Sequence, residues 1–422
     1  MSRFRALGLL LMSACGDNHN HFFEVASGSD ADVRSITVHY IAPLGTANTP
    51  TVIFQTLTDS VELVTRLDAN GFANARVSTD ANVTIAVDHA NTRSLYTYMG
   101  VHPGDAVEVD DRTASGPLDL RTVTLDAPTS DGATAYLLET PCGDFDVSSS
   151  ILDPGAGTVP LSLPDCPSPM DLIVRAFGQS TTYLYAPDSP IPDTMQVSLT
   201  GGYRSLDPVA FEIVGATDFI VAQVLIGLVG QSRVLVSDQS GVSLTLTTNG
   251  SINTSRPPGA TQYREATLLA PFAVSRLHVV EWGDSTARWV VDAGASSPAA
   301  LLSAPIYDAQ EHAIVWNEAQ GATSDAVLVT FGWADETTNF QWTVLAPRED
   351  GTKLTLPRLP GPELTPNGSL VQPFVFATIS TDSGYRAVGT RLLGSWRPGL
   401  PWPLEEPFGR VRYRDLDATF VR

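Results

Sequence analysis

Apolar and polar residues alternate with a period of two along much of this chain. Clear examples lie at residues 36–40, 83–87, 195–199, 242–246 and 340–344. Successive side chains of a strand point to opposite faces, so each such segment buries one face and exposes the other to water. In FQWTV, Trp342 shares the apolar face with Phe340 and Val344 and is predicted to lie in a core. By the same reasoning, Thr84 is predicted to face water.

Proline and glycine are spread through the whole sequence. The chain holds 30 prolines and 33 glycines, and in a helix interior they cost about 3 and about 1 kcal/mol, respectively. Turn formers such as DANG at 68–71 and SDG at 130–132 separate the alternating segments at short intervals. The sequence therefore predicts an all-β protein of tandem antiparallel β-sandwich domains.

The N-terminal stretch RFRALGLLLMSAC has the order of an export signal. Arg3 and Arg5 precede an apolar run at 6–12 and two small residues. A spanning helix needs roughly 20 apolar residues, and this run is much shorter. Residues 1–14 are therefore predicted to be a cleaved signal peptide. The following Cys15 begins the mature chain in this interpretation.

The tail MSAC of that stretch resembles the lipobox of bacterial lipoproteins. The resemblance implies that Cys15 is acylated and holds the protein to membrane lipid, in the periplasm or at the cell surface. The alternative is an ordinary secretory signal that leaves Cys15 as a free thiol. Residues 15–33 are polar and hold His19 and His21, which read as part of a flexible, solvated linker rather than as metal ligands.

The charge of the chain limits its partners. The formal net charge is -21 at pH 7. Binding to phosphate backbones is driven by Lys and Arg that displace counterions, so nucleic acid is not an expected partner.

Two further cysteines, Cys142 and Cys166, form an even pair in a chain predicted to be exported. Such a pair favours a disulfide, which would stabilise the fold by about 3.5 kcal/mol in the chain-entropy model. A metal site is disfavoured because there is no C-x-x-C spacing and no histidine between them.

Three domains are predicted after the linker. They span residues 34–112, residues 118–205 with the cysteine pair, and residues 206–422, which hold all seven tryptophans. The last segment forms either one domain or two fused units that meet near residue 300. The stretch VIFQTLTDSVELVTRLDANGFANARVSTDANVTIAV, at 52–87, resembles carboxypeptidase-regulatory-like and immunoglobulin-like modules of bacterial surface proteins. That resemblance implies a spacer or binding module without catalytic residues. SLYTYMGVHPGDAVEV and the whole layout resemble uncharacterised bacterial lipoproteins, which implies no activity.

Motifs that carry catalysis or bind cofactors are absent from the sequence. There is no G-x-S-x-G, H-E-x-x-H, P-loop or G-x-G-x-x-G. A glycosidase would need two converging carboxylates. Glu281 and Asp284 lie beside Trp282, but alternation turns Glu281 away from the face of His278 and Trp282. No catalytic residue, cofactor or metal site is therefore predicted.

The proline-rich stretch SWRPGLPWPLEEP is the candidate ligand platform. Its prolines prevent a continuous strand ladder and favour an extended loop. The platform residues are Trp396, Arg397, Trp402, Glu405 and Glu406. The alternative is that both rings cap the end of a sandwich.

The sequence thus predicts a non-enzymatic, membrane-anchored lipoprotein with a structural or binding role, its ligand a glycan or a protein. The alternative function is an exported polysaccharide-binding protein or hydrolase that uses the C-terminal domain.

Overall fold

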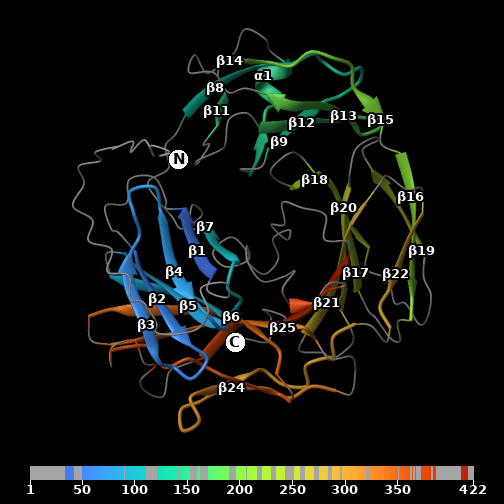
Figure 1. Cartoon of the computed structure of the whole chain (residues 1–422). Coiled ribbons are helices and arrows are strands. Elements are labelled where there is room, and N and C mark those ends of the chain that lie inside the picture. The colour runs from blue at the N-terminus through green and yellow to red at the C-terminus, as the bar shows by residue number, and fades with distance from the viewer. Residues whose placement is uncertain are drawn as a thin grey trace, which may run out of the picture.

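Figure 1 shows the computed structural model of the whole chain. The structure describes residues 34–41, 50–89, 91–110, 121–140, 143–152, 159–161, 170–189, 196–205, 207–215, 221–229, 234–242, 251–256, 262–269, 275–283, 288–294, 297–319, 324–335, 337–349, 351–361, 364, 366, 372–381, 384–385 and 410–416.

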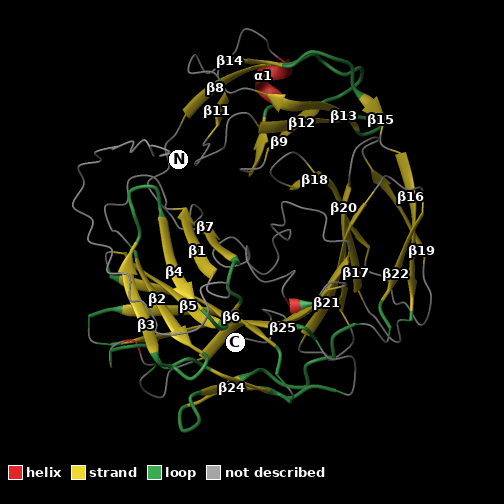
Figure 2. Ribbon diagram, in the orientation of Figure 1, coloured by secondary structure: helices red, strands yellow, loops and turns green. Residues whose placement is uncertain are grey.

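The protein is all-β, as predicted, with several antiparallel sheets (Figure 2). Its helix α1 (Ser148–Leu152) has five residues, or about one and a half turns. None of the helices among the described residues is long and apolar enough to cross a membrane.

The first unit is a two-layer sandwich. Its strands are β1 (Arg34–Ile41), β2 (Thr51–Thr56), β3 (Val61–Arg66), β4 (Phe72–Val77), β5 (Ala81–His89), β6 (Thr92–Val101) and β7 (Ala106–Asp110). In one layer β1 lies between antiparallel β4 and parallel β7. The other layer has the order β3-β2-β5-β6.

The second and third units repeat this plan. The second contains β8 (Arg121–Asp126), β9 (Ala135–Thr140), β10 (Gly143–Asp146), β11 (Val159–Leu161), β12 (Met170–Phe177), β13 (Thr182–Ser189), β14 (Gln196–Ser198) and β15 (Arg204–Ser205). The third contains β16 (Asp207–Val214), β17 (Val221–Val229), β18 (Val234–Val242), β19 (Ser251–Arg256), β20 (Gln262–Leu269), β21 (Ser275–Gly283) and β22 (Arg288–Asp292). In each, the first strand pairs antiparallel with the fourth and parallel with the seventh. The remaining strands follow the order third, second, fifth, sixth, and in the second unit β15 pairs antiparallel with the sixth strand, β13, at the end of the sheet.

The fourth unit keeps most of the plan. Its strands are β23 (Ile306–Asp308), β24 (Ala313–Val315), β25 (Ala326–Ala334), β26 (Asn339–Pro347), β27 (Lys353–Thr355), β28 (Gln372–Thr381) and β29 (Arg410–Leu416). If β24 is taken as the first strand, β26-β25-β28-β29 has the order of the other units, and β27 pairs antiparallel with β24. β23 lies on the other side of β24, where the other units have their seventh strand.

Strand edges join three of the units into one sheet. The sheet has twelve strands in the order β18-β17-β20-β21-β29-β28-β25-β26-β6-β5-β2-β3. The third and fourth units meet where β21 pairs antiparallel with β29, and the fourth and first meet where β26 pairs parallel with β6. In Figure 1 the first unit lies at the left, the fourth at the bottom and the third at the right, with the second unit at the top.

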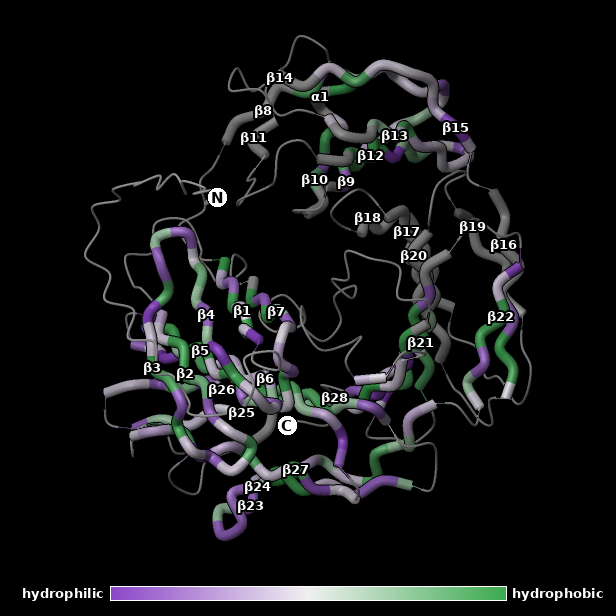
Figure 3. The backbone as a smooth tube through the Cα atoms, in the orientation of Figure 1, coloured by the Kyte–Doolittle hydropathy of each residue, from purple (hydrophilic) through white to green (hydrophobic). Residues whose placement is uncertain are grey.

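Both faces of the central strands are covered by hydrophobic cores. Along β25, Val327 and Phe331 belong to one core, and Leu328 on the opposite face belongs to another that includes the interior of the first unit. In Figure 3 the hydrophobic colour follows these strands, while the turn beyond β23 is hydrophilic.

Alternation correctly predicts one buried face and misses the second. Trp342, Phe340 and Val344 are buried together, as predicted. Thr84, predicted to face water, is instead fully buried, and its Oγ1 lies 2.7 Å from Thr97 Oγ1. The reason is that the fourth unit packs over this face of the first, and the Trp342 indole donates to Thr97 Oγ1 at 2.8 Å.

The domain boundaries predicted from the sequence remain predictions. The twelve-stranded sheet, however, runs from β3 through β26 to β18, so strands from the first and the last predicted domains are hydrogen-bonded into one sheet.

Candidate functional site

The site residues predicted from the sequence lie outside the described residues. They are Cys15, Cys142, Cys166, Trp396, Arg397, Trp402, Glu405 and Glu406. Lipidation, the disulfide and the ligand platform therefore stay predictions.

Glu281, one of the two carboxylates considered for hydrolysis, joins the layers of the third unit. It is buried on β21 and accepts a hydrogen bond of 2.8 Å from the Trp289 indole on β22. Asp284 lies outside the described residues. The Glu281 carboxylate thus has a structural partner in the facing layer.

A buried ionic network lies at the seam between β21 and β29. His278 Nε2 is 3.1 Å from Asp415 Oδ1, and the Arg276 guanidinium donates two bonds to the same carboxylate at 2.9 and 3.2 Å. Burial alone would raise the pKa of Asp415, but the bonds from His278 and Arg276 together hold that pKa below its ordinary value.

Three side chains at the same seam are hydrogen-bonded in the sequence hydroxyl, imidazole, carboxylate, as in a hydrolase triad. Thr267 Oγ1 lies 3.0 Å from His278 Nδ1, so a hydroxyl, an imidazole and a carboxylate follow one another. The imidazole is 3% exposed, however, and stacks on the Tyr413 ring at 4.3 Å. A substrate has no approach to the His278 ring in this packing, and the network is best explained as the connection between two units.

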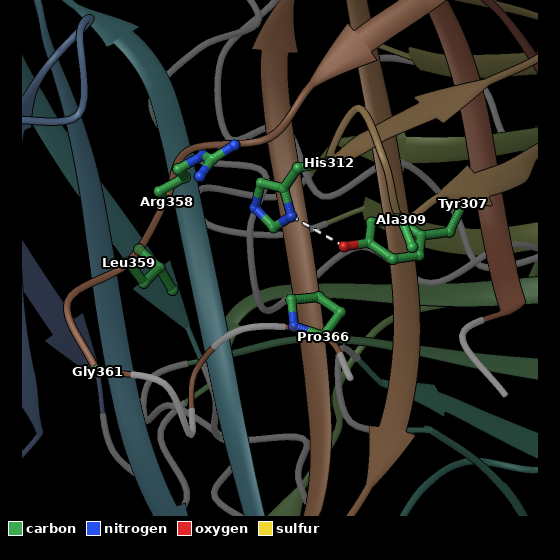
Figure 4. Close-up of a pocket in the computed structure, with 7 residues that line it drawn as sticks. All are labelled: Tyr307, Ala309, His312, Arg358, Leu359, Gly361 and Pro366. Atoms are coloured by element: carbon green, nitrogen blue, oxygen red, sulfur yellow. Dashed lines mark hydrogen bonds between the residues drawn. The ribbon is translucent and has the colours of Figure 1, made fainter. Parts of the chain in front are cut away.

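The fourth unit contains a cavity of about 380 Å³, within the range of roughly 300–1,000 Å³ that is usual for small-molecule sites. Its lining residues are Tyr307, Ala309, His312, Arg358, Leu359, Gly361 and Pro366 (Figure 4). They come from the β23–β24 hairpin and from the segment after β27. This cavity is the candidate functional site.

The hairpin turn positions the polar wall of the cavity. Asp308 Oδ1 accepts hydrogen bonds from the backbone N–H groups of Gln310 and Glu311, an arrangement that stabilises the turn. The next residue, His312, has a φ of 51°, in the left-handed region that β-carbon sterics disfavour. Strained residues of this kind cluster at functional sites.

Both ring nitrogens of His312 have partners in the wall. Nε2 lies 3.3 Å from the Pro357 carbonyl, which can only accept, so Nε2 carries the hydrogen. Nδ1 is then the acceptor for the Tyr307 hydroxyl at 2.9 Å, the contact drawn in Figure 4. Burial is the main cause that lowers the pKa of His312, so the ring is neutral at pH 7.

The opposite wall is connected to the first unit. The buried Gln55 side chain on β2 donates through Nε2 to the Arg358 carbonyl at 2.8 Å. This bond fixes the backbone from which the Arg358 side chain extends. Figure 4 shows Arg358 and Tyr307 on opposite sides of the His312 ring.

The arrangement is suited to binding rather than to proton transfer. Because both nitrogens of His312 are hydrogen-bonded in the wall, the ring cannot act on a ligand without breaking one of these bonds. The Tyr307 oxygen retains lone pairs, and the exposed Arg358 guanidinium offers a planar set of donors that fits carboxylates. Leu359 and Pro366 supply apolar surface.

Sequence reasoning did not identify this site. Tyr307 and Arg358 belong to different segments, and the histidines are scattered along the sequence without a motif. Within the described part of the chain, no group of three or more His, Cys, Asp and Glu side chains could hold a metal ion.

Comparison with known proteins assigns no family. No protein-family model matches the sequence, and no curated protein matches it. Nine chains of solved structures match. One is the Bacillus anthracis TIE protein, at 6% identity and a TM-score of 0.15, over 62% of this chain and 50% of that chain. This chain thus aligns with about half of that structure, and a TM-score this low carries no argument about fold or function.

Proposed function

We propose that this protein is a non-enzymatic lipoprotein of the cell envelope, anchored through acylated Cys15, whose sandwich units form a scaffold with a binding role. The observation that carries the proposal is the repeated strand plan, in which three units share a twelve-stranded sheet. Such a layout supports a rigid body built for spacing and presentation. The export signal and the resemblance of residues 52–87 to surface modules favour the same role.

The four tryptophans whose burial the structure describes favour this role over a polysaccharide hydrolase. A sugar platform exposes two or more rings, whereas sandwich cores bury theirs. Trp289, Trp316, Trp333 and Trp342 are all at least 94% buried. These four rings therefore serve the cores of the third and fourth units.

The Tyr307–His312–Arg358 cavity supports ligand binding as part of this role. The cavity suits a small ligand that carries a carboxylate beside hydroxyl or apolar groups, as acidic sugars do. Arg358 supplies donors for the carboxylate, Tyr307 supplies an acceptor, and Leu359 and Pro366 supply apolar surface.

The anchor is tested by fractionation of the host cells. The native chain is expected in the membrane fraction, and Cys15→Ser is expected in the soluble exported fraction because the acyl chains are lost. Membrane attachment that persists in Cys15→Ser would contradict the lipoprotein assignment.

The binding role is tested with a glycan array that includes uronic-acid glycans, probed with the soluble Cys15→Ser chain. Arg358→Ala should weaken binding about tenfold or more because a charge-assisted hydrogen bond is lost. Arg204→Ala is the control, since Arg204 is exposed on β15 in a different unit. Equal binding by the Arg358→Ala variant would place the ligand elsewhere, and hydrolysis of a bound glycan would contradict the non-enzymatic role.

A further inference from the structure

The hydrogen-bonding direction of Tyr307 is set by its partner in the cavity wall. Both Tyr307 and His312 line the cavity. While His312 is neutral, its Nδ1 can only accept, so the Tyr307 hydroxyl donates its hydrogen into the wall at 2.9 Å. The cavity then meets only the lone pairs of the Tyr307 oxygen.

The wall also determines where His312 would take up a proton. Its Nε2 lies 3.3 Å from the Pro357 carbonyl, which can only accept, so Nε2 already carries a hydrogen. The side chain is buried and held between this carbonyl and Tyr307. A further proton can therefore go only to Nδ1, the atom that faces the Tyr307 hydroxyl.

Protonation of Nδ1 reverses the bond to Tyr307. An imidazolium donates from both nitrogens, so Nδ1–H donates to the Tyr307 oxygen. The hydroxyl hydrogen is then free to turn toward the cavity. The same phenol offers a donor to a bound group where it offered an acceptor before.

The charge of Arg358 makes this proton sensitive to a ligand. Burial is the main cause that lowers the pKa of His312, and the positive charge of Arg358 lowers it further, whereas Asp59 raises it. Arg358 also lowers the pKa of Tyr307, against the larger raising effects of burial and Asp308. A carboxylate bound to Arg358 would offset its positive charge and favour the proton on His312.

Other described neighbours of the ring leave this balance unchanged. Glu311, the residue before His312, is paired with Lys353 through its side chain, so these two charges compensate each other. The Trp342 ring lies 6.3 Å from the His312 ring and is uncharged. Arg358 is therefore the neighbour through which a bound anion would act on the ring.

We propose that His312 is a positioning residue that sets the donor direction of Tyr307 and couples the binding of a carboxylate ligand in this cavity to the uptake of a proton. The inference rests on the binding role proposed above and adds how that binding is regulated. The proton passes from solvent to His312 Nδ1, and no other covalent bond changes. After uptake, both the Arg358 guanidinium and the Tyr307 hydroxyl can donate to carboxylate oxygens.

The sign of the pH dependence follows from linkage. The ligand raises the pKa of His312, so the complex binds the proton more tightly than the free protein does. Affinity for a carboxylate should therefore rise as the pH falls, until the ring is protonated in the free protein as well.

The test is isothermal titration calorimetry of the soluble Cys15→Ser chain with D-glucuronate as the probe, from about pH 8 to about pH 5.5, where a carboxylate stays ionised. We expect the affinity to rise about tenfold over this range because a charge-assisted hydrogen bond is gained. Titrations in two buffers of different ionisation enthalpy should show proton uptake on binding.

Two variants separate the ring from the hydroxyl. His312→Asn tolerates the left-handed backbone but cannot take up the proton, so its affinity should not change with pH. Tyr307→Phe lacks the hydroxyl and should lose most of the gain at low pH. The matched control is His102→Asn, which replaces a partly exposed histidine between β6 and β7 and should keep the full pH dependence. Circular dichroism at each pH verifies that every variant is folded.

The outcomes distinguish the coupling from the binding role itself. Glucuronate binding that is equally tight at every pH, or a pH dependence that persists in His312→Asn, would overturn the coupling and leave the binding role standing. A full gain at low pH in Tyr307→Phe would overturn the reversal of the hydroxyl. A native chain that does not bind glucuronate at any pH would overturn both the coupling and the cavity as a site for acidic sugars.

Discussion

Trp342 is the residue whose replacement should show most directly that the first and fourth units share one structure. The ring is fully buried on β26, packs against Phe331, Trp333 and His312, and donates through Nε1 to Thr97 Oγ1 on β6 of the first unit. Trp342→Ala therefore removes both a large part of a core and a bond between two units.

The cost of this substitution follows from the two losses. Truncation of a buried tryptophan to alanine leaves a cavity and costs about 3–5 kcal/mol of unfolding free energy. The lost hydrogen bond is worth about 0.5–1.5 kcal/mol within this total, because Thr97 keeps Thr84 as a partner at 2.7 Å and is not left unsatisfied. Trp342→Phe keeps most of the ring volume and should cost only about 1–2 kcal/mol.

Urea unfolding measures these differences in unfolding free energy. Tryptophan fluorescence is a suitable signal because all seven tryptophans lie after residue 206, in the same part of the chain as the substitution. A double-mutant cycle of Trp342→Phe with Thr97→Val isolates the bond between the units, and a coupling of about 0.5–1.5 kcal/mol is expected. A cost below about 1 kcal/mol for Trp342→Ala would refute the buried position of the ring. Zero coupling in the cycle would refute the contact with the first unit.

Three further predictions follow from other parts of the chain. Intact-mass analysis without reductant should find a disulfide between Cys142 and Cys166, and alkylation of either thiol would contradict it. Because burial lowers the pKa of His312, the unfolded chain binds the proton more tightly, and the unfolding free energy should fall as pH drops below about 6.5. His312→Asn tolerates the left-handed backbone and should lose less stability over that pH range in chemical denaturation; an unchanged pH dependence would contradict this assignment. If Trp396 and Trp402 form a ligand platform, Trp396→Ala and Trp402→Ala should abolish glycan binding with little change in Tm, whereas a fall of several degrees in both variants would make them structural caps.

The sequence was sufficient to predict the strand class and the buried face of β26. Period-two alternation is a local property, and Phe340, Trp342 and Val344 carry it within five residues. It could not predict that Thr84 is buried, because the segment that covers Thr84 belongs to the fourth unit, far along the chain. A polar residue within a strand is read as solvent-facing unless its long-range partner is known.

The repeated plan and the cavity were missed for related reasons. The units share strand order but not residue identity, since a sandwich requires only that apolar residues alternate, and many sequences satisfy that requirement. The cavity depends on a hydrogen bond between Tyr307 and His312 and on a segment held by Gln55 of another unit. These contacts are set by tertiary packing, and no motif in the sequence marks them.

The buried polar groups of this chain show how its units select their neighbours. Alternating apolar strands could pair in many registers, because hydrophobic contacts are not directional. At the seam of the third and fourth units, a shift of one residue between β21 and β29 would turn Asp415 away from Arg276 and His278 and leave a buried charge unpaired. Breaking a buried ionic pair typically costs about 3–5 kcal/mol. Thr84, Thr97 and Trp342 have the same effect at the seam of the fourth and first units. The apolar strands thus make edge pairing favourable, and the few buried polar groups determine which edges pair and in which register.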